Sequence, residues 1–257
     1  MTVALIYHDV VAAARQDECG FPGAIAARYK LEPDRFEAHL DAIAATGVTI
    51  GGIGDGSGAA LTFDDGGASA LDAAEVLERR GWRGHFFVTT GRIGTPGFLT
   101  AAQVRELAER RHTVGSHSNS HPTYMGSLSA AELATEWRSS REALAEILGA
   151  EPDSAAVPGG FLSADVIAEA ARAGYRLLLT SQPTTRLSSH DGMRVHGRFT
   201  IWAATTPARA AAYARGDRRA LASLWIAWQA KTAPKRISPS AYEAVRRRWA
   251  RRRQATG

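Results

Sequence analysis

Short apolar segments alternate with amphipathic segments along most of the chain. The apolar segments are predicted to be strands, at residues 3–7, 59–63, 85–88, 113–116, 155–157, 175–180 and 193–196. The amphipathic segments are predicted to be helices, at 33–45, 68–80, from Thr100, from Ser129 to Gly149, and after Ile201. Thr100 and Ser129 each begin a capping box, because Gln103 and Glu132 follow them at the required spacing. This alternation predicts an α/β protein with a parallel sheet.

Two groups of polar residues follow predicted strands. Asp64 and Asp65 come directly after the strand at 59–63, and His117 and His121 follow the strand at 113–116. The carboxyl ends of strands in α/β proteins carry the catalytic groups. The spacing of the histidines predicts that both rings lie on one side of a helical turn. One carboxylate and two imidazoles form a facial set of metal ligands with open positions, which indicates a metal-dependent hydrolase.

Each motif has a simpler interpretation when it is taken alone. Paired aspartates are common in turns and at helix N-termini, and His-x-x-x-His occurs on exposed helices. Found together, each after its own strand, the two motifs favour the metal site. Borderline ions are expected there, zinc first and cobalt or nickel as alternatives.

The two motifs resemble those of a known family. Thr62-Phe63-Asp64-Asp65-Gly66, followed by Ser116-His117-Ser118 and His121-Pro122, is similar to the first two motifs of the polysaccharide deacetylases, carbohydrate esterase family four. The resemblance runs from about Val3 to about His196. It implies a distorted (β/α)7-type barrel, the NodB-homology domain, with a divalent metal that is usually zinc. It also implies removal of acetyl groups from sugars, on nitrogen or on oxygen.

The resemblance assigns roles to these residues. Asp65, His117 and His121 would bind the metal, and Asp64 would be the general base. A third family motif is matched only in part at residues 155–160, where Gly159 could donate its backbone N–H to the oxyanion. Ala156 stands in the slot of the arginine that usually orients the catalytic aspartate. This substitution puts the strength of the base in question.

The general acid has more than one candidate. The family's last motif is an apolar strand followed by His-Asp, and the N-terminal strand followed by His8-Asp9 matches it. This arrangement resembles the circularly permuted poly-N-acetylglucosamine deacetylases, so His8 is the expected acid. His196, at the end of the last predicted strand, is the competing candidate. His190-Asp191 is a poor match, because no strand is predicted before it and a connecting loop is expected there.

Length and composition agree with one domain. The 257 residues are close to the ~250 typical of a (β/α) barrel, which we expect at 1–200, with a helical basic extension at 201–257 packed on the same domain. Trp225, Trp228 and Trp249 are available for that packing. Cys19 is the only cysteine, which excludes an intramolecular disulfide. The first residues show no signal peptide, so we expect a cytoplasmic protein unless a leader has been removed.

Positive charge is concentrated near the C-terminus. The formal net charge is +5, and the last 27 residues contain nine lysines and arginines. A solvated helix face is the simple explanation. The alternative is a peripheral contact with anionic membrane lipid or with a lipid-linked glycan. Nucleic acid is not expected, since no binding motif accompanies the charge. The sequence leaves the oligomeric state open.

Two classes of function are compatible with these motifs. The first is a metal-dependent hydrolase that removes an acetyl group from an N-acetylated sugar and releases acetate. Its substrate could be a polysaccharide, an oligosaccharide, a glycoconjugate precursor or a small non-polymeric molecule. The second is a non-catalytic saccharide-binding relative, which Ala156 favours. The intact Asp64, Asp65, His117 and His121 favour the enzyme.

Overall fold

A single curled sheet organises the computed structural model, which describes residues 2–53, 58–160, 162–190 and 192–237. Its strands lie in the order β7-β8-β6-β5-β4-β3-β2-β1-β9, and all neighbours are parallel except β7 and β8. The strands are β1 (Val3–Tyr7), β2 (Ala59–Phe63), β3 (His85–Val88), β4 (Thr113–Ser116), β5 (Ser154–Ala156), β6 (Leu177–Leu179), β7 (Leu187–His190), β8 (Met193–His196) and β9 (Phe199–Thr200). The predicted α/β fold with a parallel sheet is confirmed.

The two ends of the sheet are connected by only two residues. β8 pairs with β6 near one edge, and β9 pairs with β1 at the other. Gly197 and Arg198 are all that separates β8 from β9 along the chain. The sheet therefore curls until its two edges come close together, and the segment β8–β9 contributes a strand near each edge. The N-terminal strand lies beside the last strand, as the permuted motif order requires.

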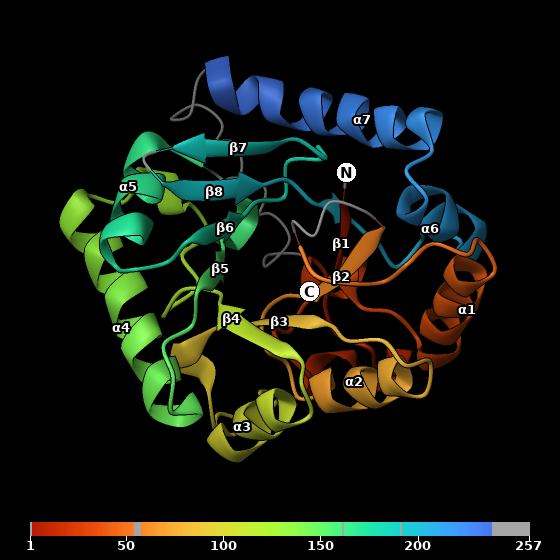
Figure 1. Cartoon of the computed structure of the whole chain (residues 1–257), viewed down its shortest axis with the longest axis horizontal. Coiled ribbons are helices and arrows are strands. Elements are labelled where there is room, and N and C mark those ends of the chain that lie inside the picture. The colour runs from red at the N-terminus through yellow and green to blue at the C-terminus, as the bar shows by residue number, and fades with distance from the viewer. Residues whose placement is uncertain (1, 54–57, 161, 191, 238–257) are drawn as a thin grey trace, which may run out of the picture.

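Helices cover the outside of the curled sheet (Figure 1). They are α1 (Pro33–Ala44), α2 (Ala70–Glu78), α3 (Ala101–Glu109), α4 (Ala130–Leu148), α5 (Ala164–Arg172), α6 (Pro207–Ala214) and α7 (Arg218–Ile237). Short 3₁₀ turns lie at η1 (Ala13–Glu18), η2 (Ala26–Tyr29), η3 (Thr90–Arg92), η4 (Met125–Ser127) and η5 (Pro158–Gly160). Both predicted capping boxes form, at the starts of α3 and α4. Among the described helices, none is both long and apolar enough to cross a bilayer.

Aromatic side chains fill the core below the ends of β1 to β3. Phe63 stacks on Tyr7 at 5.6 Å and on Phe86 at 4.7 Å between ring centroids. Phe36 of α1 packs edge-on against Tyr7, and all four rings are buried. Every residue of β1 and β2 is buried, as expected for parallel strands with both faces covered. This packing fixes the ends of the strands that the polar motifs follow.

Three details differ from the sequence predictions. β7 and β9 were not predicted, because β9 has only two residues and β7 is mostly polar and exposed at the sheet edge. His190 consequently lies in β7 and not in a connecting loop. Trp225 is 44% exposed, so it is not a core residue. Trp249 and the basic residues after 237 lie outside the described residues. The division of the chain at residue 200 stays a prediction.

Candidate metal and catalytic site

Asp64 and Asp65 end the buried strand β2 with a sharp change of backbone direction. Asp64 still donates its N–H to the carbonyl of Tyr7 at 3.1 Å, which continues the pairing with β1. Asp65 and Gly66 then adopt left-handed φ angles of 78° and 79°. A Cβ atom at Gly66 would lie 2.9 Å from Val88 Cγ1, so the turn requires glycine there. The turn lets two adjacent carboxylates meet different partners.

His117 and His121 approach each other through a strained loop and not through a helix. The predicted helical turn is wrong, because residues 117–122 contain no helix and both Ser118 and His121 have φ of 61°. The Ser118 hydroxyl accepts the His121 N–H at 3.1 Å, which closes the loop. Together with Asp65, these are three of the four described non-glycine residues with positive φ. Such conformations cost about 1–3 kcal/mol each and concentrate at functional sites.

Glu136 of α4 supports this loop from outside. Its carboxylate accepts the backbone N–H groups of Asn119 at 3.0 Å and Ser120 at 2.8 Å, and also the Ser120 hydroxyl at 2.5 Å. Backbone donors that a helix would satisfy internally are therefore satisfied by a side chain. Glu136 stabilises the conformation that brings His121 to His117.

Asp65, His117 and His121 form the one cluster in the described part of the chain with a metal-binding arrangement of side chains. Their ligand atoms all lie within 4.8 Å of one another. Asp65 Oδ1 is 3.4 Å from His117 Nε2 and 3.3 Å from His121 Nε2. Tetrahedral ligands about 2.1 Å from a zinc ion are separated by about 3.4 Å. Both imidazoles thus present Nε2 to one carboxylate oxygen at spacings that fit a divalent ion.

A backbone carbonyl fixes the orientation of the His117 ring. Its Nδ1 lies 2.9 Å from the carbonyl oxygen of Ala156, which fits an Nδ1–H donor and leaves Nε2 as the ligand atom. Position 156 therefore contributes through its backbone, which any residue can supply. The three predicted ligands are brought together, and their donor set fits the expected borderline metal ions.

Arg198 supplies the arginine that is missing from position 156. Its Nη1 and Nη2 donate to the two carboxylate oxygens of Asp64 at 2.7 and 2.8 Å, and Nη1 also donates to Thr62 Oγ1 at 2.9 Å. Its Nε lies 3.3 Å from the carbonyl oxygen of Thr180. Arg198 is only 1% exposed, and its guanidinium lies over the ring of Phe87. This bidentate pair fixes the orientation of Asp64.

Sequence reasoning missed Arg198, although one signal was available. Arg198 follows the apolar strand at 193–196 and precedes Phe199 and Ile201, so a charged residue stands within a buried segment. Arginine is almost never fully buried unless it is paired. Its partner, however, lies 134 positions earlier in the chain, and no local pattern points to it.

The charges of the site are strongly coupled. Burial by itself raises the pKa of Asp64, but Arg198 and then His117 outweigh it and leave that pKa lowered. Asp65 behaves alike, with hydrogen bonds from His117 and His121 holding its pKa well below the usual range despite burial. Both carboxylates are therefore ionised at neutral pH. One can serve as a ligand and the other as a base.

His8 lies near both aspartates, at the end of β1. Its positive charge, when present, would lower the pKa of Asp64 and of Asp65, and its buried Nδ1 has no hydrogen-bond partner. The His8 ring packs on Tyr29, with centroids 4.7 Å apart, and Tyr29 stacks on Trp202 at 4.8 Å. His8 is thus placed in the site without being one of the three clustered ligands.

His196 lies away from this group. β9 runs parallel to β1 with Phe199 opposite Leu5, which places His196 at the level of Thr2. Thr2 is five residues before Tyr7, so the two ends of this strand are separated by about 16 Å at a rise of about 3.3 Å per residue. His196 Nδ1 is bound to the Gly197 carbonyl at 2.6 Å, and burial lowers the pKa of His196. The register does not favour His196 as the acid.

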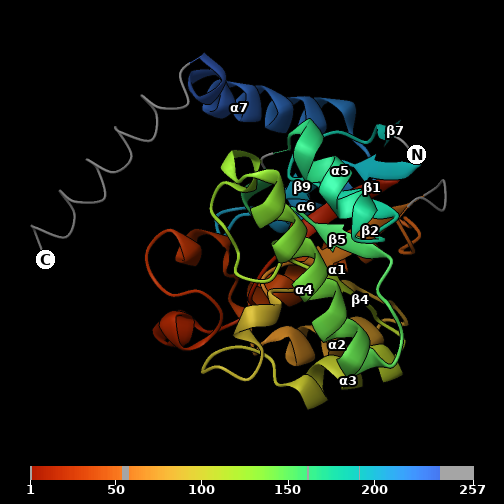
Figure 2. The same ribbon diagram turned by 90° about the vertical axis from the view of Figure 1, so that its left-hand side faces the viewer.

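The segment between β1 and α1, red in Figure 2, borders the site. Its Phe21 ring lies 4.6 Å from the His121 ring and 5.1 Å from Phe98. Buried Lys30 holds the segment in place: its ammonium donates to the carbonyls of Gln16, Cys19 and Phe21 and lies 3.6 Å from Asp9 Oδ2. Asp9, the second residue of the His-Asp pair, is therefore part of this anchor.

The Pro158-Gly159-Gly160 turn follows β5. Gly159 has φ of 63° and Gly160 φ of 71°, and a Cβ atom at Gly160 would collide with Ser181. The assignment of the Gly159 N–H as an oxyanion donor stays a prediction.

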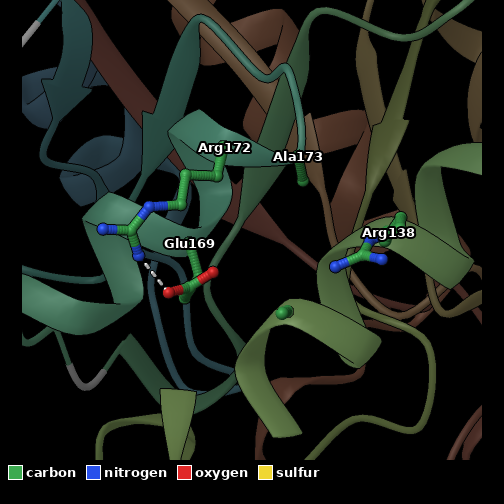
Figure 3. A pocket seen from close by; sticks show the side chains of 5 residues that line it. Arg138, Glu169, Arg172 and Ala173 are labelled. Atoms are coloured by element: carbon green, nitrogen blue, oxygen red, sulfur yellow. Dashed lines mark hydrogen bonds and ion pairs between the residues drawn. The ribbon is translucent and has the colours of Figure 1, made fainter. Parts of the chain in front are cut away.

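A small pocket elsewhere has no such chemistry. It has a volume of about 80 Å³, lies between α4 and α5, and is lined by Ala134, Arg138, Glu169, Arg172 and Ala173 (Figure 3). The carboxylate of Glu169 is paired with Arg172. None of the predicted catalytic or metal-binding residues lines this pocket.

Comparisons with known proteins agree with the geometry. Residues 52–178 match the family model described as polysaccharide deacetylase. A Bacillus subtilis (strain 168) protein named as a polysaccharide deacetylase, YxkH, is 26% identical over 124 residues, which are 48% of this chain and 44% of that protein. The matched stretch thus spans less than half the length of that curated relative.

Solved structures show the same fold. BC0361, a polysaccharide deacetylase from Bacillus cereus, superposes with a TM-score of 0.70 at 20% identity, covering 82% of this chain and 68% of that one. IcaB from Ammonifex degensii superposes with a TM-score of 0.65 at 22% identity, covering 84% of this chain and 97% of that one. At these identities the likeness is one of fold.

Proposed function

We propose a specific activity for this chain, which contains a polysaccharide deacetylase domain at residues 52–178. The protein would be a metal-dependent hydrolase, removing the acetyl group from an N-acetylated sugar and releasing acetate. One observation supports this above all. Asp65, His117 and His121 converge on one point, and the adjacent Asp64 is held by a buried arginine. A protein that only bound saccharides would have no need of that second feature.

Asp65, His117 and His121 would hold the metal, with Nε2 of each imidazole as the donor atom. A divalent ion in this site would supply Lewis-acid polarisation of the acetyl carbonyl and a water of lowered pKa. The chain's own contribution is to orient these ligands. The Ala156 carbonyl does so through the Nδ1 of His117, and Glu136 does so through the backbone N–H of Asn119 in the loop that carries His121.

Asp64 would take the proton from the attacking water. The bidentate contact with Arg198 fixes the position of the carboxylate and keeps it ionised at neutral pH. A lowered pKa makes a weaker base, but orientation and a guaranteed charge state offset this. Arg198 thus orients Asp64 although position 156 is an alanine. The presence of this arginine favours the enzyme over the non-catalytic relative.

His8 would protonate the leaving amine, and the Gly159 N–H would stabilise the oxyanion. The His8 ring lies near both aspartates without belonging to the three clustered ligands, which leaves it available for this role. The Phe21 ring beside His121 and the Tyr29 ring beside His8 would contact the apolar faces of the sugar. Phe98 packs against Phe21, and Trp202 stacks on Tyr29.

Acetate release tests the proposal. The purified protein is incubated with N-acetylglucosamine oligomers, nucleotide sugars and lipid-linked sugars, and free acetate is measured. Activity should appear on at least one of them, disappear after dialysis against a chelator, and return with zinc or cobalt. Full activity in the metal-stripped protein would contradict the metal requirement. Saccharide binding without acetate release, in protein shown to contain metal, would leave the binding relative as the better explanation.

A further inference from the structure

Helix α7 exposes apolar side chains on the face that points away from the protein. Ile226 is 63% exposed and Trp225 is 44% exposed, and they are two of the five large hydrophobic residues exposed in the described part of the chain. Ala222 and Ala230 are also exposed. Ala222, Ile226 and Ala230 recur at intervals of four positions and Trp225 follows Ala222 by three, so helical spacing places all four on one side of α7. We call them the outer face of α7.

The opposite face of α7 accounts for the attachment of the helix to the protein. Ala220, Leu221 and Leu224 are partly buried and pack against the main hydrophobic core. Arg209 of α6 donates to the Ser223 hydroxyl at 2.7 Å. Packing therefore explains the apolar residues of the inner face but leaves Trp225 and Ile226 unexplained. Figures 1 and 2 show α7 at the periphery, with its long side uncovered.

Two exposed arginines lie on the side of the outer face. Arg218 and Arg219 are exposed one turn before Ala222, on the same side of the helix. The sequence 218–237 contains five lysines and arginines and no aspartate or glutamate. The sequence after it adds six arginines and a single glutamate. A helix that exposes a tryptophan and an isoleucine beside two arginines, in a strongly basic stretch of sequence, is suited to the interface of an anionic membrane.

We propose that the outer face of α7 docks on the surface of an anionic phospholipid bilayer. Trp225 and Ile226 would enter the region between head groups and acyl chains, and Arg218 and Arg219 would contact lipid phosphates. A second copy of this chain fits less well, because a contact between two copies of α7 would bring positive charge from both copies into one interface. The helix would lie in the plane of the membrane surface.

Vesicle sedimentation with the full chain tests this proposal. Phosphatidylcholine vesicles containing about one-third phosphatidylglycerol are compared with pure phosphatidylcholine vesicles. The protein should bind at least tenfold more tightly to the anionic vesicles, and binding should weaken as salt is raised. Substituting Trp225→Ser and Ile226→Ser together should weaken binding at least tenfold. The matched control is Ile25→Ser, because Ile25 is 68% exposed but lies far from α7 in the chain.

Three results would overturn the proposal. The first is equal binding to neutral and anionic vesicles. The second is undiminished binding by the Trp225/Ile226 double variant, which would assign the lipid contact to the basic residues alone. The third is a dimer in solution that the double variant converts to a monomer, which would make the outer face a contact between copies. All three readouts are independent of acetate release.

Discussion

Substituting Arg198 by methionine tests whether this residue holds Asp64 in place. The side chains of Arg198 and Asp64 are 1% and 6% exposed, so removal of the arginine leaves a buried carboxylate without its main compensating charge. Breaking one side of a buried pair typically costs about 3–5 kcal/mol. The geometry around Thr62 is less affected, because its hydroxyl also donates to the Leu5 carbonyl at 2.8 Å.

Protonation of Asp64 sets an upper limit on that cost. Without Arg198, burial would raise the pKa of Asp64 above its unfolded value of about 3.9, and the folded protein could take up a proton instead of burying the charge. At pH 7 this limit is about 4 kcal/mol, from about three pH units at about 1.4 kcal/mol each. At pH 5 it is only about 1.5 kcal/mol. The destabilisation by Arg198→Met should therefore shrink as the pH falls.

Urea unfolding of metal-stripped protein at pH 7 and pH 5 measures this. We expect Arg198→Met to lower the free energy of unfolding by about 3–4 kcal/mol at pH 7. Adding Asp64→Asn should restore most of that loss, as in a double-mutant cycle. Arg79→Met is the control, because Arg79 is 48% exposed and its ion pairs should contribute less than about 1 kcal/mol. Equal losses in the Arg198 and Arg79 variants, with no dependence on pH, would refute the assignment.

Three further predictions concern residues with separate roles. Asp65→Asn should lose bound metal, whereas Asp64→Asn should keep it and lose ~10²- to 10⁴-fold in turnover; equal metal loss in both would show that the roles are misassigned. His8→Ala should lose turnover on an acetamido sugar far more than on an activated acetyl ester, which needs little protonation of the leaving group, while His196→Ala should be mild on both; a selective amide defect in the His196 variant would move the acid there. The pKa of Glu78 is lowered to about 2, chiefly by its hydrogen bonds with Arg110. Ionised Glu78 therefore stabilises the fold above its unfolded pKa of about 4.3, and this contribution is lost as the pH falls toward 2. Glu78→Gln should thus be less stable than the wild type at pH 7 but not at pH 2, and a difference that persists unchanged in acid would contradict this.

The sequence was sufficient for the parts of the site that depend on local order. Asp64, Asp65 and His117 directly follow buried strands, and the apolar runs that mark those strands are unambiguous. Their meeting at one edge follows from parallel strand direction alone. The family predicted from these motifs is confirmed by the matching model over 52–178.

The parts that failed depend on contacts between distant residues. The His117–His121 spacing predicted a helical turn, but backbone donors are satisfied instead by Ser118 and Glu136, and Glu136 lies on another element. Arg198 could not be paired with Asp64 without knowing that β9 lies beside β1. Trp225 fits a helical pattern equally well inside or outside, and only the packing of α7 decides.

The pairing of Asp64 with Arg198 also orders events during synthesis of the chain. The three residues of the candidate metal site have all been translated by residue 121, but the charge that compensates Asp64 arrives only at residue 198, next to the strand that completes the sheet beside β1. At about 5–20 residues per second, several seconds separate the two. During that interval the emerging chain contains Asp64 without the arginine that pairs with it. The charge that compensates the burial of Asp64 therefore arrives together with β9, so the last strand to be made both completes the sheet beside β1 and fixes the orientation of this carboxylate.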